Sequence, residues 1–149
     1  SSLLKILNDE ICETTTRGMF VTMIVGVYDK NKNELLLSNA GHEPPLIFSN
    51  DGNFKTIDQA GPPLGIAPNF KFTEQIVSFK ESSMYIFTDG ITEMKDSSGD
   101  MLGQDGFQDY IKKYQSTPNN KRLQKIIEDL ISSGRIQKDD LTIVTVDGK

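Results

Sequence analysis

The spacing of hydrophobic residues changes twice along the chain. Over residues 1–13 apolar positions recur every three or four residues, which predicts an amphipathic helix. Short apolar runs rich in β-branched and aromatic side chains follow and predict strands, at residues 19–28, 34–39, 46–49, 54–57, 70–79 and 84–87. Helical spacing returns over 107–114 and 123–131, and a last strand pattern covers 141–146. Hairpins followed by helices predict an α+β fold in which helices cover antiparallel sheet.

Polar and proline-rich segments separate the predicted strands. Asn50-Asp51-Gly52-Asn53 is a strong hairpin turn, and the prolines in 40–45 and 61–65 cannot donate ladder hydrogen bonds. The strand at 19–28 is apolar at successive positions, so we expect both of its faces to be buried. No internal repeat and no linker divides the pattern.

The stretch Met84–Met94 combines a buried strand with an acidic turn. Four apolar residues stop abruptly at Thr88-Asp89-Gly90, where the chain turns and exposes a carboxylate. One interpretation is that Asp89 caps the short helical turn over 91–94, because Asp accepts hydrogen bonds from free backbone N–H groups. Another is that Asp89 binds a ligand.

A second acidic motif favours the ligand interpretation. Asp139-Asp140 comes directly before the last predicted strand, whereas Asp89 directly follows its own strand. If the two strands are antiparallel neighbours, the acidic motifs lie at the same edge of the sheet. Carboxylates gathered in one place repel one another unless a cation neutralises them, and Mg²⁺ and Mn²⁺ prefer such oxygen ligands. The sequence therefore predicts a carboxylate-lined metal site.

Composition narrows the function classes. The net charge is -5 at pH 7 and the basic residues are scattered, which argues against a nucleic-acid surface. No apolar run is long enough to cross a bilayer, so we expect no membrane contact by this segment. With one cysteine, Cys12, and one histidine, the chain has neither an internal disulfide nor a Cys/His zinc cluster, and a cytoplasmic setting is expected.

Three other kinds of site are disfavoured. The loop 96–100 is rich in Asp, Ser and Gly, but its glycine is misplaced for a calcium loop and no glutamate closes it. An aspartyl-phosphate transferase would need a second aspartate two residues after Asp89, where Ile91 stands. The chain also lacks the Gly-x-Ser-x-Gly elbow of a serine hydrolase.

Six ordered segments give the sequence a family resemblance. It resembles the metal-dependent serine/threonine phosphatases of the PP2C superfamily (PPM), in the bacterial branch typified by the sporulation phosphatase and the stress-response sigma-factor phosphatases. The matching segments, which span nearly the whole chain, are Phe20-Val21-Thr22, Ser38-Asn39-Ala40-Gly41-His42 with Pro44-Pro45, Pro63-Leu64-Gly65, Phe87-Thr88-Asp89-Gly90-Ile91-Thr92-Glu93, Leu102-Gly103 and Asp139-Asp140-Leu141-Thr142.

The resemblance implies a fold, a cofactor and a reaction. The fold would be layered antiparallel sheets flanked by helices, with two Mn²⁺ or Mg²⁺ ions at one end. Asp89 and Asp139 occupy the family's ligand positions, Asp140 is their neighbour, and Gly90 is adjacent to the metal. A metal-activated water would attack phosphoserine or phosphothreonine, so no side chain serves as nucleophile. The expected partner is a phosphorylated regulatory protein, similar to an anti-anti-sigma factor, and an upstream sensor domain is expected.

The sequence departs from the family pattern at one point. The upstream aspartate of a glycine-rich Gly-Asp motif, which bridges the two metals in the family, has no equivalent here. We therefore expect residues 1–149 to be the C-terminal portion of a PP2C-like domain, lacking the opening strands and part of the two-metal site. Two hypotheses stay open: a phosphatase whose truncated chain can be inactive, and a catalytically incompetent module that binds a signalling partner.

Two further residues each allow a functional and a structural interpretation. His42 could act as an acid or contact phosphate, or it could donate a hydrogen bond that fixes its own loop; we favour the structural role. Glu93 follows Asp89 by one helical turn, and a surface or capping role is favoured over metal ligation.

Overall fold

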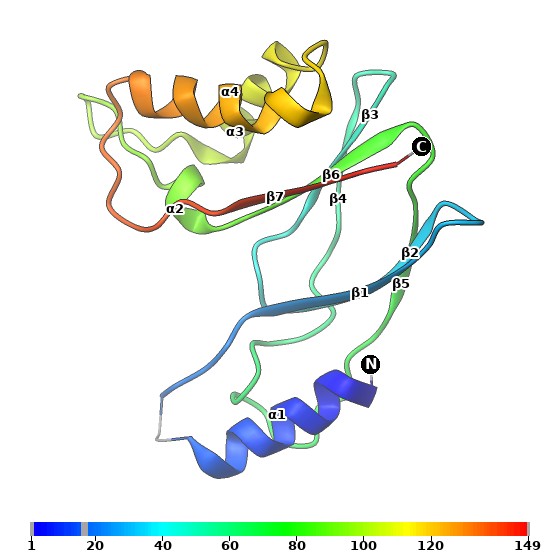
Figure 1. Cartoon of the computed structure of the whole chain (residues 1–149). Coiled ribbons are helices and arrows are strands. Elements are labelled where there is room, and N and C mark those ends of the chain that lie inside the picture. Colours follow the sequence, from blue (N-terminus) through cyan, green and yellow to red (C-terminus); the bar gives the residue numbers. More distant parts are fainter. Residues whose placement is uncertain (1, 16–17, 149) are drawn as a thin grey trace. The chain divides into compact units, whose positions relative to one another are not determined.

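The computed structural model describes residues 2–15 and 18–148. The elements, in order, are α1 (Ser2–Thr14), β1 (Met23–Asp29), β2 (Glu34–Ala40), β3 (Leu46–Ser49), β4 (Phe54–Thr56), β5 (Gln75–Ser78), β6 (Ser82–Phe87), α2 (Asp89–Thr92), α3 (Gly103–Lys113), α4 (Asn119–Ser132) and β7 (Ile143–Asp147) (Figure 1). The predicted order of helix, strands, two helices and a last strand is confirmed. No helix in the described part of the chain is long and apolar enough to cross a membrane.

The chain forms two compact units. The first unit contains Ser1–Pro45, Thr56–Ser82 and Gly148–Lys149, and the second contains Leu46–Lys55 and Ser83–Asp147. Each unit has its own sheet: β1-β2-β5 in the first and β4-β3-β6-β7 in the second.

In the first unit α1 packs against an antiparallel sheet. Both β1 and β5 pair antiparallel with β2. The shared core consists of the buried residues Leu4, Ala40, Leu64 and Phe72. The buried side chain of Asn8 fixes the helix to a loop, because its amide donates to the Ala67 carbonyl (2.9 Å) and accepts from the Gly65 N–H (3.1 Å).

The prediction that residues 19–28 form a strand buried on both faces is wrong in two respects. The strand begins only at Met23, and Val27 is 70% exposed. Val27 pairs with Leu36, which pairs with Ile76, so these partly or largely exposed residues form a row across the sheet. A run of apolar residues indicates that a strand has hydrophobic side chains on both faces, but it does not show whether other residues cover each face of the strand.

The second unit places helices on one face of its sheet. Side chains from α3 and α4 and from alternate strand positions share one core, made of Leu46, Phe48, Tyr85, Phe87, Ile91, Met94, Phe107, Ile111, Ile126 and Leu130. The predicted turn at 50–53 is confirmed, since the Ser49 N–H donates to the Asn53 carbonyl across it (3.0 Å). Gly134, with φ of 76°, follows the C-cap residue of α4, a position where glycine commonly ends a helix.

A buried ion pair joins the start of α4 to the end of β7. Arg122 Nη2 donates to Asp147 Oδ1 (2.6 Å) and to Asn119 Oδ1 (2.6 Å). Ser83 Oγ also donates to Asp147 Oδ1 (2.5 Å). The carboxylate therefore accepts from a helix side chain and from the neighbouring strand at once.

Candidate metal site

The end of β6 and the start of β7 meet at one edge of the second unit's sheet. The strands are antiparallel, with Phe87 opposite Ile143, so the turn after β6 lies beside the turn before β7. The Thr88 N–H donates to the Thr142 carbonyl (3.1 Å), the Thr142 N–H donates to Thr88 Oγ1 (3.1 Å), and Thr88 Oγ1 donates to the Asp140 carbonyl (3.0 Å). The antiparallel pairing that the expected convergence of the two acidic motifs requires is therefore present.

Gly90 allows the two acidic turns to touch. A Cβ atom built on Gly90 would lie 2.4 Å from the Asp140 carbonyl oxygen and 3.3 Å from the Asp139 carbonyl carbon. Because those atoms belong to backbone, no side-chain rotation can relieve the overlap. Glycine at this position is therefore what permits the close approach of the two turns.

Asp89 is exposed at the first position of α2. Thr88 occupies the N-cap position and makes no side-chain cap hydrogen bond, so the interpretation of Asp89 as the cap is wrong. The buried Gly90 and Ile91 anchor the turn beneath the Asp89 carboxylate.

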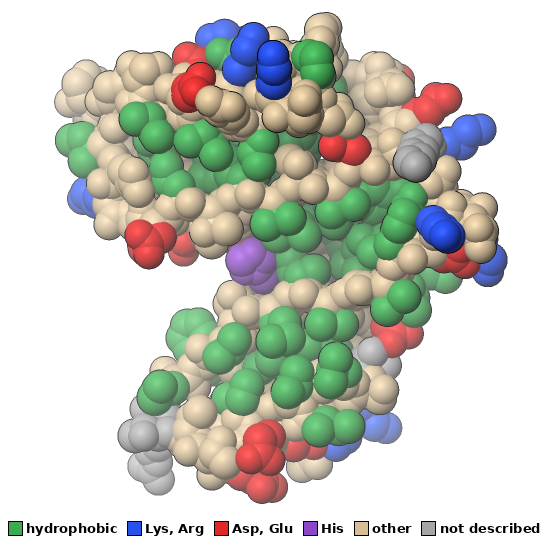
Figure 2. Space-filling model, viewed as in Figure 1, with side chains coloured by type: hydrophobic (Ala, Val, Ile, Leu, Met, Phe, Trp, Pro, Cys, Tyr) green, Lys and Arg blue, Asp and Glu red, His purple; other side chains and the backbone are tan. Residues whose placement is uncertain are grey.

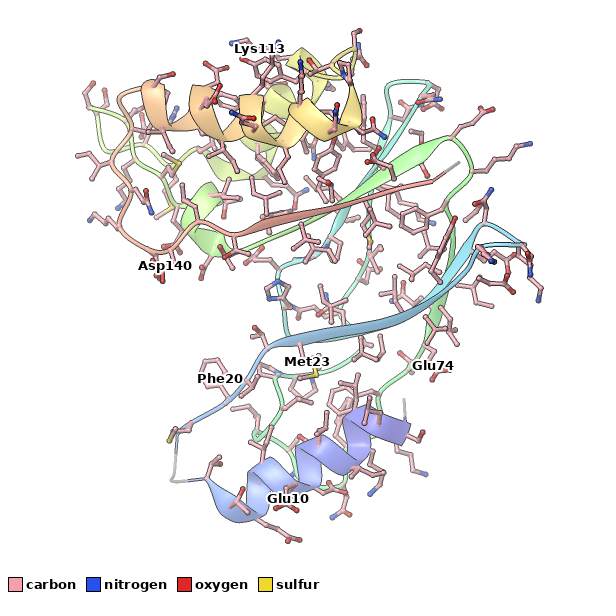
Figure 3. All side chains as sticks on the ribbon, viewed as in Figure 1. Glu10, Phe20, Met23, Glu74, Lys113 and Asp140 are labelled. Carbon is pink, nitrogen blue, oxygen red and sulfur yellow. The ribbon has the colours of Figure 1, made fainter. Side chains whose placement is uncertain are left out.

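The second acidic turn is also exposed (Figure 3). Asp139 Oδ1 accepts from the Asp140 N–H (2.7 Å), and the Asp139 carbonyl accepts from Gln137 Nε2 (2.9 Å). These contacts order the turn, and the Asp140 carbonyl is held by Thr88 as described above. One carboxylate oxygen of Asp139 therefore already accepts a hydrogen bond within its own turn.

These exposed carboxylates are of the chemical type that a hard divalent cation prefers. Among residues 2–15 and 18–148, no three His, Cys, Asp or Glu residues are grouped closely enough to form a closed metal cluster. Mg²⁺ in particular keeps several waters and is commonly held by one or two carboxylates together with substrate phosphate. Asp89, Asp139 and Asp140 are the carboxylates exposed at this junction, and their ligation of a metal stays a prediction.

Comparison with known proteins identifies the family of this chain. The family described as Stage II sporulation protein E (SpoIIE) matches residues 1–149. The chain belongs to the SpoIIE family. The predicted resemblance to the sporulation and sigma-factor-regulator branch of PP2C-like phosphatases is confirmed.

Individual relatives and one solved structure are also similar to this SpoIIE-family chain. Protein IcfG of Synechocystis sp. (strain ATCC 27184 / PCC 6803 / Kazusa) is 31% identical, over 96% of this chain and 23% of IcfG. Phosphoserine phosphatase RsbU of Bacillus subtilis (strain 168) is 26% identical, over 98% of this chain and 44% of RsbU. The manganese-presoaked structure of the SpoIIE phosphatase domain from Bacillus subtilis has a TM-score of 0.65 at 18% identity, over 97% of this chain and 63% of that one. The chain thus spans less than half the length of IcfG and RsbU.

His42 lies in the loop between β2 and β3 of the SpoIIE-family chain, in the first unit. Its carbonyl accepts from Asn39 Nδ2 and from Gln59 Nε2 (both 3.1 Å), and its N–H donates to Asn39 Oδ1 (2.9 Å). Its ring Nδ1 lies 3.2 Å from Thr22 Oγ1. The backbone of His42, held mainly by the buried Asn39, fixes the loop, and contact of the ring with phosphate stays the less favoured alternative.

Sequence reasoning missed the roles of Thr88 and Asn39. Both stand inside segments that carried the family resemblance, which was the available signal. Thr88 contacts residues 52 and 54 positions away, and no local pattern specifies such contacts.

Replacing Thr88 with Val is expected to lower the free energy of unfolding by about 1–2 kcal/mol, because the Thr142 N–H and the Asp140 carbonyl each lose a partner. Thr88→Ser keeps the hydroxyl and should recover most of that stability. Urea unfolding of both variants measures the difference. No loss of stability in Thr88→Val would contradict a role for the hydroxyl, and an equal loss in Thr88→Ser would show that the methyl group of Thr88 matters as much as the hydroxyl.

Proposed function

We propose that the protein containing this chain is a metal-dependent phosphatase that removes phosphate from phosphoserine or phosphothreonine in a regulatory protein. The observation that carries this proposal is the junction of the two acidic turns at the edge of β6 and β7, within a SpoIIE-family chain. RsbU, whose name is phosphoserine phosphatase, aligns over 98% of the chain and supports the same reaction.

In this proposal Asp89 and Asp139, with Asp140 as neighbour, hold Mn²⁺ or Mg²⁺. The metal would supply an activated water and neutralise charge on the phosphate oxygens. Carboxylates alone repel a phosphate dianion, so these residues favour substrate only when a cation is bound. Thr88 and Gly90 hold the two turns in contact, and no side chain is required as nucleophile.

The proposal extends to the longer protein. We take residues 1–149 as the C-terminal portion of a PP2C-like domain whose two-metal site is completed by polypeptide outside them. The match to only 63% of the SpoIIE phosphatase domain supports this view. An upstream sensor domain, a cytoplasmic setting and a partner similar to an anti-anti-sigma factor belong to the same proposal.

Asp89→Asn and Asp139→Asn test the site in the full-length protein. Each removes one carboxylate, and each is expected to raise the dissociation constant for Mn²⁺ by at least about tenfold in calorimetry. Turnover of a phosphoserine peptide should also fall, because less metal is bound. Asp109→Asn, which changes an exposed carboxylate of α3, is the matched control and should change neither quantity. Unchanged Mn²⁺ binding in both site variants would contradict the assignment.

A catalytically incompetent module that binds a signalling partner is the second candidate. The upstream aspartate of the family's Gly-Asp motif, which has no equivalent in this sequence, is the observation that motivates it. This candidate predicts that partner binding survives both Asp89→Asn and removal of metal with EDTA, while the full-length protein shows no Mn²⁺-dependent turnover. Metal-dependent turnover would exclude it.

A further inference from the structure

The segments that flank the two acidic turns also pair with each other. Lys95 lies three residues after the end of α2, and Ile136 lies three residues before Asp139. The Lys95 N–H donates to the Ile136 carbonyl (3.2 Å), and the Ile136 N–H donates to the Lys95 carbonyl (2.7 Å). Lys95 also pairs antiparallel with Met101. The loop after α2, the return of that loop and the segment before Asp139 therefore lie side by side (Figure 1).

The Arg135 side chain crosses this pairing. Its Nη1 donates to the Met94 carbonyl (3.3 Å) and to the Asp100 carbonyl (3.2 Å), and its Nη2 lies 3.8 Å from Asp96 Oδ2. A guanidinium presents several donors in a planar fork, so one side chain can hold both ends of the loop after α2. The contact with Asp96 is long and both side chains are partly exposed, so this ion pair contributes little. We therefore assign the effect of Arg135 to its two carbonyl hydrogen bonds.

Met94 connects Arg135 to the turn that carries Asp89. The Met94 side chain is buried, and the Met94 N–H donates to the Ile91 carbonyl of α2 (3.3 Å). Arg135 precedes Asp139 by four residues, so its side chain joins the two acidic turns through a short length of chain. Hydrogen bonds at the sheet edge thus hold the two turns directly, and Arg135 holds the segments that lead to and from them.

Exposed carboxylates on neighbouring turns need such support. Figure 2 shows acidic side chains (red) at the surface beside the start of β7, where the second acidic turn lies. Like charges repel, and this repulsion acts to separate the two turns when no cation is bound. Ligands bind a metal tightly only when neighbouring groups fix their positions.

We propose that Arg135 is a positioning residue of the metal site: its hydrogen bonds to two carbonyls of the loop after α2 fix the Asp139-Asp140 turn relative to Asp89. This inference deepens the proposed function and rests on it, because it takes the carboxylates of the two turns as metal ligands. Arg135 acts through those residues and contacts neither metal nor substrate in this role.

The positive charge of Arg135 gives the test a sign. If Arg135 acted only by its charge, replacing it with neutral Met would strengthen Mn²⁺ binding, because a nearby cation repels the ion. If it positions the second turn, Arg135→Met should raise the dissociation constant for Mn²⁺ by about tenfold in calorimetry on the full-length protein. An unchanged or lower dissociation constant in Arg135→Met would overturn the proposal.

Two further variants accompany Arg135→Met. Arg135→Lys keeps the charge but loses the planar fork, so it should raise the dissociation constant by about threefold. This milder change also keeps the proposal testable if Arg135→Met does not fold, and wild-type affinity in Arg135→Lys would then overturn it. Lys121→Gln removes an exposed charge of α4 and is the matched control, which should not weaken Mn²⁺ binding.

A double variant shows whether Arg135 acts through the second acidic turn. In an Asp139→Asn background the turn has already lost a ligand that Arg135 positions, so Arg135→Met should add less than about threefold to the dissociation constant. A further rise of about tenfold would show that Arg135 acts independently of that turn and would overturn the proposal.

The same calorimetry separates this inference from the proposed function. If Asp89→Asn and Asp139→Asn weaken Mn²⁺ binding and Arg135→Met does not, only the positioning role fails. If neither acidic variant weakens binding, the metal site itself fails, and the positioning role is overturned with it.

Discussion

Replacing Asp147 with Asn is expected to lower the free energy of unfolding by about 3 kcal/mol. Asp147 Oδ1 lies 2.6 Å from Arg122 Nη2, and the Arg122 side chain is only 8% exposed. The amide cannot neutralise the guanidinium, so the variant retains a buried charge without its counter-ion. Removing one partner of such a pair costs far more than the pair itself contributes.

Arg122→Met should cost less than Asp147→Asn. The Asp147 side chain is 24% exposed, so water can solvate the carboxylate left behind, and Ser83 Oγ still donates to it. Met also preserves much of the buried apolar stem of the arginine. The double variant should therefore be more stable than the sum of the two single losses predicts.

Urea unfolding followed by circular dichroism measures these differences. The ion pair between Lys113 and Asp129 is the control, because the Lys113 side chain is 58% exposed and surface pairs contribute little. Asp129→Asn should thus have a small effect. Equal unfolding midpoints for Asp147→Asn and Asp129→Asn would contradict the view that burial of Arg122 sets the cost.

The sequence specified the centre of the second unit well. Four apolar residues ending in Thr-Asp-Gly predicted β6 and its turn, and the β-branched run after Asp139-Asp140 predicted the strand β7. Both strands follow from local pattern, because a strand pattern and the turn residues that bound it are contiguous in sequence, whereas their pairing joins segments that are distant in sequence.

Other features depended on tertiary packing. Residues 70–79 have strand composition, but only Gln75–Ser78 join the ladder. Phe70 and Phe72 instead contact each other, with ring centroids 5.0 Å apart, and pack in the core beneath α1. Aromatic and β-branched residues in a sequence indicate side chains that pack on a half-buried surface. They do not determine whether the backbone of the segment pairs with a neighbouring strand.

The candidate site likewise combines features that the sequence predicts with features that depend on tertiary packing. The residue types that suit a divalent cation were visible in the sequence, and so was the expectation that they converge. Thr88 as a bridge between the two turns was not visible, because its partners Asp140 and Thr142 are distant in sequence. The close contact of Gly90 with Asp140 likewise arises only when β6 and β7 pair.

That contact makes Gly90→Ala the most informative change at the site. In an isolated helix, Ala is favoured over Gly by about 1 kcal/mol. Here the new Cβ would lie 2.4 Å from the Asp140 carbonyl oxygen, so the turn that carries Asp139 and Asp140 must move. We expect the overlap to outweigh helix propensity and to lower the free energy of unfolding by about 2 kcal/mol.

Displacing that turn should also weaken metal binding. Movement of Asp140 breaks its hydrogen bond from Thr88 and separates the second acidic turn from Asp89. We therefore expect the dissociation constant for Mn²⁺, measured by calorimetry on the full-length protein, to rise by about tenfold to a hundredfold.

Gly106→Ala is the matched control for Gly90→Ala. Gly106 lies within α3, and a Cβ there would lie 2.6 Å from Cδ1 and 3.0 Å from Cγ of Leu102, a side chain that can rotate, and would meet no backbone of another element. This variant should gain helix propensity and keep the Mn²⁺ affinity unchanged. If Gly90→Ala binds Mn²⁺ as tightly as Gly106→Ala does, the Asp139-Asp140 turn is not part of the metal site, and Asp89 must act with ligands from elsewhere.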